Sequence, residues 1–332
     1  MATSHIHEAT QLLANAEHMH MCAFTDDRLL RNTLRKYKLK ERVTSPTTGL
    51  YVRQDYWSRL STEEQHLHIA RALQAKHPNW VFYGPTAALA YGFAVPYNSL
   101  AKIHVMHTKG ACRANGLIKH RRFPEHMKAT LSNPYIASDI AVPNPAETIL
   151  QCLCTMNFSD GLCIADSALR VLNKSKEWLL EAVKQLGKQR KGIVQARLTA
   201  SFANPRAESG GESIARARII ELGFALPELQ APIFDPLSQK TFRADFLWIL
   251  PDGRKVAGEL DGRQKYCDPN MTNGRSIVDV MADERLRESR ISRQVSVMRF
   301  SFADVCNLVF LDKLLNSFDI PHAIHPFMTQ PY

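Results

Sequence analysis

The alternation of apolar and polar positions in the C-terminal third of the chain predicts a β-hairpin. Two apolar runs, residues 242–250 and 256–260, flank the sequence Pro251-Asp252-Gly253-Arg254. Asp-Gly between two strand-like runs is a strong short-range hairpin signal. In chain order we expect a helix from Ser209 to Gly223, a strand at 229–234, the hairpin, a loop at 270–276, a charged helix at 279–292, a strand at 295–302 and a helix at 303–315. This order predicts a mixed sheet flanked by helices.

The first 60 residues have the pattern of two helices followed by a short hairpin. Residues 5–18 have helical spacing, and a second helix is expected from about Asp27, capped by Thr25 or Asp26. The segment RVTSPTTGLYVR then predicts strand, turn and strand. Helices followed by a hairpin resemble a winged helix-turn-helix, whose second helix commonly enters a major groove of DNA. The residues expected to contact DNA are Arg31, Arg35 and Lys38 of this helix and Arg53 near the hairpin; a solvated charged face is the alternative.

Residues 61–207 are predicted to form a mixed α/β region without a catalytic constellation. In chain order we expect a helix from Ser61 to Lys76, a strand at 80–83, a helix ending at Gly92, strands at 102–107 and 116–120, and helices opening at Pro145, at 158–172 and at 176–186. Asp166 is interpreted as a carboxylate on a helix surface. Several histidines and cysteines are interpreted as packed or surface residues and not as metal ligands. They are His66, His68, His104, His107, His120, Cys152 and Cys154.

Length and charge add to this picture. A chain of 332 residues exceeds one typical domain, and we expect domains at 1–60, 61–207 and 208–332. The formal net charge of +10 favours a polyanion partner such as nucleic acid. The seven cysteines lack zinc spacing and are expected to be reduced thiols. The polar N-terminus, and the lack of an apolar run of roughly 20 residues, predict a soluble cytoplasmic protein without a membrane partner.

Acidic residues interrupt both strands of the predicted hairpin. Asp245 lies in the first apolar run, and Glu259 and Asp261 lie in the second. Buried carboxylates are costly unless they pair with a cation, and side chains two apart on a strand share a face. If the strands pair, three oxygen ligands meet at one end of the sheet, which suits a hard divalent cation such as Mg²⁺. A turn role for Asp261, or an ordinary salt-bridge network, is the alternative.

Asp245, a short hairpin and the sequence Glu-Leu-Asp-Gly from Glu259 resemble the PD-(D/E)xK nuclease superfamily, most of all its very-short-patch-repair-endonuclease-like branch. The resemblance covers residues 208–305. It implies a restriction-endonuclease-like fold that cuts phosphodiester bonds in DNA with Mg²⁺ or Mn²⁺. It also implies that Asp245, Glu259 and an acid of the first helix, Glu212, hold the metal.

The same resemblance leaves the basic catalytic group open. Asp261 stands where the wider superfamily has a lysine, as it does in the short-patch-repair-like branch. Lys265, Arg263 or a basic residue of the charged helix would then take the role of that lysine. On this helix Asp283, Arg287 and Arg290 share one face. Arg287 is expected to contact phosphate, and a solvated helix face is the alternative.

The N-terminal two thirds resemble abortive-infection type (type IV) antitoxins. The segments that carry the likeness are RVTSPTTGLYVR, YGPTAALAYGFAVP, PAETILQCL and LCIADSALR. This resemblance implies a second function: an antitoxin that represses its own operon, has a cognate toxin as partner and retains a nuclease-like domain only for binding. A purely structural partner-binding protein is the third possibility.

Overall fold

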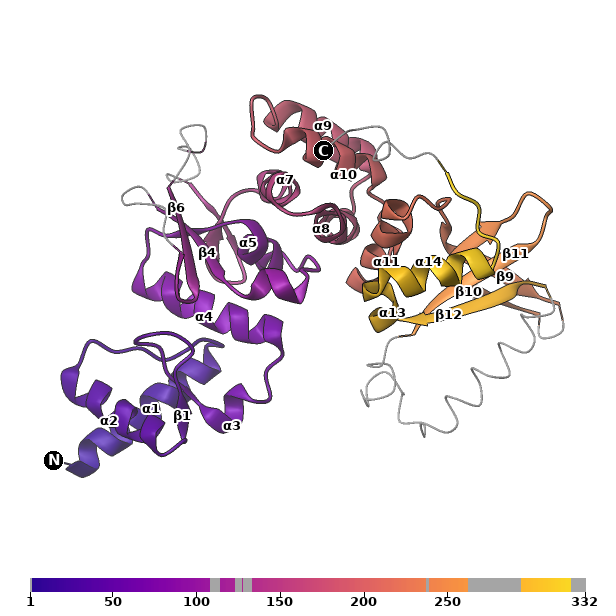
Figure 1. Cartoon of the computed structure of the whole chain (residues 1–332). Helices are drawn as coiled ribbons and strands as arrows, with labels where there is room; N and C mark the ends of the chain where they lie inside the picture. Colours follow the sequence, from indigo (N-terminus) through magenta and orange to yellow (C-terminus); the bar gives the residue numbers. More distant parts are fainter. Residues whose placement is uncertain are drawn as a thin grey trace. The chain divides into compact units, whose positions relative to one another are not determined.

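The computed structural model in Figure 1 describes residues 2–107, 114–122, 127, 133–236, 239–261 and 294–323. The fold is mixed α/β, as predicted. It divides into two compact units: Met1–Met156 with Trp178–Ala196, and Asn157–Glu177 with Arg197–Tyr332. This division differs from the three predicted ranges, because residues 157–177 and 197–207 pack with the C-terminal unit. None of the helices in the described ranges is long and apolar enough to cross a membrane.

The start of the first unit contains two helices and a small hairpin, as the pattern predicts. They are α1 (Ala2–His18), α2 (Arg28–Leu39), and the antiparallel strands β1 (Val43–Thr44) and β2 (Val52–Arg53), followed by α3 (Gln54–Trp57). The cap of α2 is Asp27 itself, whose carboxylate accepts the backbone N–H groups of Leu29 and Leu30. Leu34 of α2 is fully buried and fixes the inward face of the helix.

The rest of the first unit is a four-stranded sheet with helices. Ser61 and Glu64 form a capping box that starts α4 (Thr62–Lys76). The sheet order is β3-β4-β6-β5. The remaining elements up to the unit boundary are β3 (Val81–Phe82), α5 (Gly84–Ala90), a 3-10 helix η1 (Tyr97–Leu100), β4 (Ile103–His107), β5 (Ala114–Asn115), β6 (Ile118–Arg122), the pair β7 (Tyr135–Ala137) and β8 (Ile140–Val142), and α7 (Pro145–Thr155). Helices α9 (Lys176–Leu186) and α10 (Ile193–Phe202) come later in the chain, and α10 lies where no helix is predicted from the sequence.

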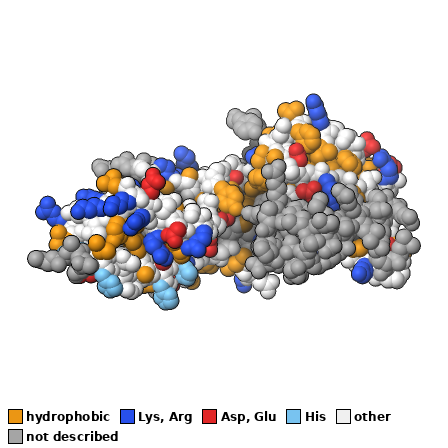
Figure 2. Space-filling view, turned by 90° about the horizontal axis from the view of Figure 1, so that it is seen from below, with side chains coloured by type: hydrophobic (Ala, Val, Ile, Leu, Met, Phe, Trp, Pro, Cys, Tyr) orange, Lys and Arg blue, Asp and Glu red, His pale blue; other side chains and the backbone are white. Residues whose placement is uncertain are grey.

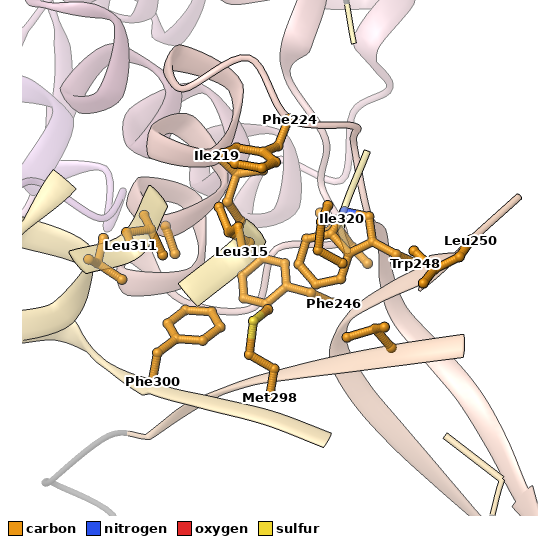
Figure 3. Packing of buried hydrophobic residues seen from close by; sticks show 14 of the residues in the cluster. Ile219, Phe224, Phe246, Trp248, Leu250, Met298, Phe300, Leu311, Leu315 and Ile320 are labelled. Atoms are coloured by element: carbon orange, nitrogen blue, oxygen red, sulfur yellow. The ribbon is translucent and has the colours of Figure 1, made fainter. Parts of the chain in front are cut away.

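The second unit is built on the sheet β12-β11-β10-β9. Its elements are α8 (Phe158–Val171), α11 (Gly210–Glu221), β9 (Glu228–Asp235), β10 (Lys240–Ile249), β11 (Lys255–Asp261), β12 (Ser296–Ser301), α13 (Phe302–Cys306) and α14 (Leu308–Ser317). The predicted hairpin is the antiparallel pair β10–β11, and β12 runs parallel to β11. Figure 3 shows Phe246 and Trp248 of β10 packed with Ile219 of α11 and Leu315 of α14, so these two helices cover one face of the sheet.

Two expectations for the second unit need correction. The single C-terminal helix is two helices, because Asn307 ends α13 and its side chain then caps α14 by accepting the N–H of Phe310. Asp166 is not on a helix surface. It is fully buried in α8 and accepts two hydrogen bonds from Arg216 of α11, at 2.8 and 2.6 Å. The predicted charged helix at 279–292 lies outside the described residues.

Candidate functional site

The ladder between β9 and β10 omits one pair of residues in its middle. Backbone pairing runs on both sides of Gln230 and Asp245 in the same register but skips these two. Gln230 has φ of 52°, a left-handed conformation that few residues other than glycine adopt. The backbone at this point is therefore set by its surroundings and not by the preference of a glutamine.

Side chains change face at this pair. On β9, Leu229 lies in the main core beneath α11 and α14, whereas Ala231 lies in a second cluster that also contains Leu247. On β10, Phe246 lies in the main core and Ala244 in the second cluster. Residues two apart on a regular strand share a face, so both strands switch faces together at the omitted pair. Asp245 is half-buried at this switch.

The cap of α11 brings a second carboxylate to this point. Ser209 caps the helix by accepting the N–H of Glu212, and its hydroxyl donates to Glu212 Oε1 at 2.8 Å. The backbone N–H of Glu208 donates to Glu212 Oε2 at 2.8 Å. These bonds fold the Glu212 side chain back over the start of the helix, where the helix dipole favours negative charge. Glu212 is buried there.

One amide group joins the two carboxylates. Nε2 of Gln230 donates to Glu212 Oε2 at 3.1 Å and to Asp245 Oδ1 at 3.3 Å. The other oxygen of Asp245 accepts the backbone N–H of Leu260 at 3.0 Å, which ties the carboxylate to β11. The structure therefore brings Glu212 and Asp245 together through a glutamine that no local sequence signal singles out.

The electrostatic environment of Glu212 favours its neutral form. Burial raises the pKa of the Glu212 carboxyl above its usual value, and the nearby Asp245 carboxylate raises it further. Hydrogen bonds from Glu208, Ser209 and Gln230 oppose this shift. A positive charge placed beside the two acids would reverse the shift, because an opposite charge stabilises the ionised carboxylate.

The other acids of the hairpin lie beside an arginine. Glu259 follows the last ladder pair of β10–β11 and continues the register opposite Asp245. On its other side Glu259 is paired in register with Arg299 of β12. Asp261 Oδ1 accepts a hydrogen bond from Arg299 Nη1 at 2.9 Å. A basic group therefore reaches Asp261 from the neighbouring parallel strand, a contact that the local sequence around Asp261 could not reveal.

The described acids do not form a ready metal cage of the usual residue types. Within the ranges that the structure describes, no three His, Cys, Asp or Glu side chains are grouped closely enough to hold a metal ion. Carboxylate and amide oxygens are nevertheless the ligands that hard divalent cations prefer. The candidate residues Lys265, Arg263, Asp283, Arg287 and Arg290 lie outside the described residues.

Helix α2 of the first unit carries positive charge, in contrast to the acids described above. Between Arg28 and Lys38 the helix α2 carries five basic side chains and no acid. Arg31, Arg35 and Lys38 are spaced by four and three residues, so they share one face, and Arg35 and Lys38 are exposed. Figure 2 shows Lys and Arg side chains gathered over the N-terminal end of the chain.

The fourth candidate for DNA contact has another partner. The guanidinium of Arg53 donates from Nε to Glu17 Oε1 at 2.8 Å, and its Nη2 bonds to the other oxygen of the same carboxylate. This bidentate pair ties β2 to α1 and gives Arg53 a structural role. Sequence spacing alone does not reveal such a partner, since Glu17 is 36 residues away.

Two histidines of α4, His66 and His68, are buried and hydrogen bonded. His66 bonds to the carbonyl of Leu100 at 3.1 Å and to the hydroxyl of Thr86 at 2.9 Å. Burial lowers the pKa of His66 to about 4 and the pKa of His104 to about 4. His68 bonds to the hydroxyl of Tyr56 at 2.9 Å. His66 and His68 are therefore structural parts of the core around α4.

The two units thus hold a basic helix and a pair of converging carboxylates on a mixed sheet. No family model matches the chain. It is 31% identical over 234 residues to two proteins of Mycobacterium tuberculosis, Uncharacterized protein MT2308 of strain CDC 1551 / Oshkosh and Uncharacterized protein Rv2248 of strain ATCC 25618 / H37Rv, and the alignment covers 65% of this chain and 81% of each relative. The chain belongs to the family of these two proteins.

Among solved structures, the chain is similar to the crystal structure of RV2827C protein from Mycobacterium tuberculosis. The identity is 13%, the match covers 64% of this chain and 79% of that chain, and the TM-score is 0.32. This similarity is too low to assign a fold.

Proposed function

We propose that the chain binds DNA through α2 and cuts phosphodiester bonds with the help of a divalent cation at the Glu212–Asp245 pair. The observation that carries the proposal is the convergence of these two carboxylates, from different elements, on one amide group. No Lys or Arg among the described residues bonds to either carboxylate. A buried acid such as Glu212, next to a second acid and without a basic partner, is typical of sites that bind a cation.

The residues fit Mg²⁺ or Mn²⁺ by their chemistry. Glu212 and Asp245 would supply hard oxygen ligands, and Glu259, next in register opposite Asp245, would add a negative charge beside them. The raised pKa of Glu212 indicates that added positive charge is favourable there. A cation held there would neutralise charge on the phosphate and would lower the pKa of a bound water molecule. Asp261, paired with Arg299, would orient that arginine toward the phosphate, and Lys265 or Arg287 remain candidates for the same role.

A plasmid-nicking assay with Mg²⁺ tests the catalytic part. We expect wild type to cut, and Asp245→Asn and Glu259→Gln to lose at least a hundredfold in rate, because each removes a negative charge at the proposed cation site (about 2.7 kcal/mol for a hundredfold). Asp252→Asn is the matched control, since Asp252 is an exposed acid in the turn of the same hairpin. Equal cleavage by all four proteins would contradict the assignment.

Mobility shifts over a series of salt concentrations test the DNA-binding part. The triple variant Arg31→Ala, Arg35→Ala, Lys38→Ala should weaken binding and reduce the slope of log affinity against log salt by about 2.7, at about 0.9 for each phosphate contact. The matched control removes three exposed lysines elsewhere in the first unit: Lys184→Ala, Lys188→Ala, Lys191→Ala. Equal slopes for the two triple variants would count against α2 as the DNA-binding element.

A second function is favoured by one observation. The acid at the position of the missing lysine, Asp261, is paired with Arg299, as expected if the nuclease-like domain is kept for binding alone. The chain would then be an autoregulator or antitoxin with a toxin partner. Sequence-specific binding to DNA upstream of its own gene, unchanged by EDTA and without cleavage in Mg²⁺, would favour this function over the first.

A further inference from the structure

Gln230 stands out because three separate features meet at it. Its backbone has a positive φ, the sheet ladder skips it, and its amide bonds to two carboxylates from different elements. A strained conformation persists only where the surroundings impose it. A glutamine in an exposed hairpin turn has an obvious reason for such a φ, but a half-buried glutamine in mid-strand does not.

The geometry of the amide explains the strain. In a regular strand the side chain at position 230 would alternate with its neighbours and point away from one of the two acids. The left-handed turn of the backbone and the shared change of face instead direct Nε2 between Glu212 and Asp245. The amide thereby sets how far apart the two carboxylates lie and how they are turned.

We propose that Gln230 is a positioning residue that holds Glu212 and Asp245 in the arrangement needed to bind a divalent cation. This inference rests on the proposed function. Residues that orient metal ligands without being the main ligands commonly contribute 10–100-fold to metal affinity. Gln230 meets this description because it contacts both acids and no other described residue bonds to both.

The probe is Mn²⁺ alone, with its affinity for the full chain measured by electron paramagnetic resonance. Gln230→Met keeps the length of the side chain and removes the amide, and we expect it to weaken Mn²⁺ binding about tenfold or more. Gln230→Asn keeps an amide and tolerates a positive φ, so it should lose less. Gln230→Gly relieves the backbone but removes the amide, so its loss should equal that of Gln230→Met.

The matched control is Gln239→Met. Gln239 lies in the exposed connection of the same two strands, also has a positive φ of 54°, and donates to the carbonyl of Pro236. Its replacement should leave Mn²⁺ affinity within about twofold of wild type. Thermal unfolding of each variant identifies any that fail to fold; if Gln230→Met does, Gln230→Asn and Gln230→Gly decide the question.

The outcomes separate the inference from the proposed function. Wild-type affinity in Gln230→Met and Gln230→Gly, together with loss of binding in Asp245→Asn, would overturn the positioning role and leave the cation site in place. Loss in the Gln230 variants, with the control unchanged, supports it. No Mn²⁺ binding by wild type would remove both the cation site and the role of Gln230.

Discussion

Glu212 and three other buried carboxylates of the described residues are of two kinds, and the contrast points to the candidate site. In each of the other three, both carboxylate oxygens accept hydrogen bonds from one arginine. Glu212 is buried as deeply as Glu17, at 7% exposure for each, yet it bonds to an amide, a hydroxyl and a backbone N–H. The arginine pairs are Glu17–Arg53, Glu147–Arg190 and Asp166–Arg216.

The difference between the two kinds is one of charge balance. A carboxylate paired with arginine is already neutralised and serves to join elements, as Asp166 joins α8 to α11 in the second unit. Glu212 lies beside Asp245 instead, and this second negative charge raises its pKa. Burial alone therefore says little about function, whereas burial beside a like charge is the feature that makes Glu212 the candidate.

The largest loss of stability should come from breaking the buried Asp166–Arg216 ion pair. Asp166→Asn leaves Arg216, which is 4% exposed, without its counter-charge, and we expect a loss of about 3–5 kcal/mol in the free energy of unfolding. Urea unfolding followed by circular dichroism measures it. Arg218→Met on the same helix removes only a more exposed pair with Glu221 and should cost less than about 1 kcal/mol. If both variants lost the same free energy of unfolding, the buried pair would contribute no more to stability than the more exposed one.

A smaller loss of stability is expected when the Glu17–Arg53 pair of the first unit is broken. Arg53→Met removes the bidentate partner of the buried Glu17 and should destabilise the N-terminal region by about 2 kcal/mol, since hydrogen bonds to charged groups contribute about 1.5–3 kcal/mol. The melting temperature reports this loss. DNA affinity measured well below that temperature should change little, because Arg53 is already paired with Glu17. A large loss of DNA affinity with unchanged stability would return Arg53 to the DNA-contacting set.

The smallest effect on stability, and the sharpest test of the contrast, is expected for Glu212→Gln. The pKa of Glu212 is raised above the ordinary value of 4.5, so the folded state holds this proton more tightly than the unfolded state. Its favourable contribution is complete below pH 4.5 and is lost as the pH rises through the folded-state pKa. Wild type should therefore lose stability relative to Glu212→Gln as the pH rises from 4.5 to 7. If the stabilities of wild type and Glu212→Gln changed equally with pH over this range, the pKa of Glu212 would not be raised.

Local patterns predicted most of the elements but not the contacts that define the site. The hairpin of β10 and β11 followed from two apolar runs and Asp-Gly, and the starts of α4 and α11 followed from Ser61 and Ser209. The role of Gln230 has no local signal, because it depends on acids 18 residues before and 15 residues after it in the chain. Asp166 was misassigned for the same reason, since its partner Arg216 is 50 residues away.

Helix boundaries failed where a polar residue both ends and begins a helix. The apolar spacing from Ala303 to Leu315 is continuous enough to predict one helix. The structure breaks it at Asn307, whose side chain caps the next helix instead of continuing the first. The spacing of apolar residues shows which face of a helix is buried. It does not show where one helix ends and the next begins at a capping side chain.

The shared change of face at Gln230 and Asp245 constrains how the lengths of β9 and β10 can vary. Both strands keep one register across the irregularity, so deleting a single residue from either strand beside it would turn the remaining side chains of that strand to the wrong side. Insertions between β9 and β10, beyond Asp235, avoid this penalty because they lie outside the ladder. A reporter peptide or affinity tag placed in that connection should be tolerated, whereas one placed next to Gln230 should not.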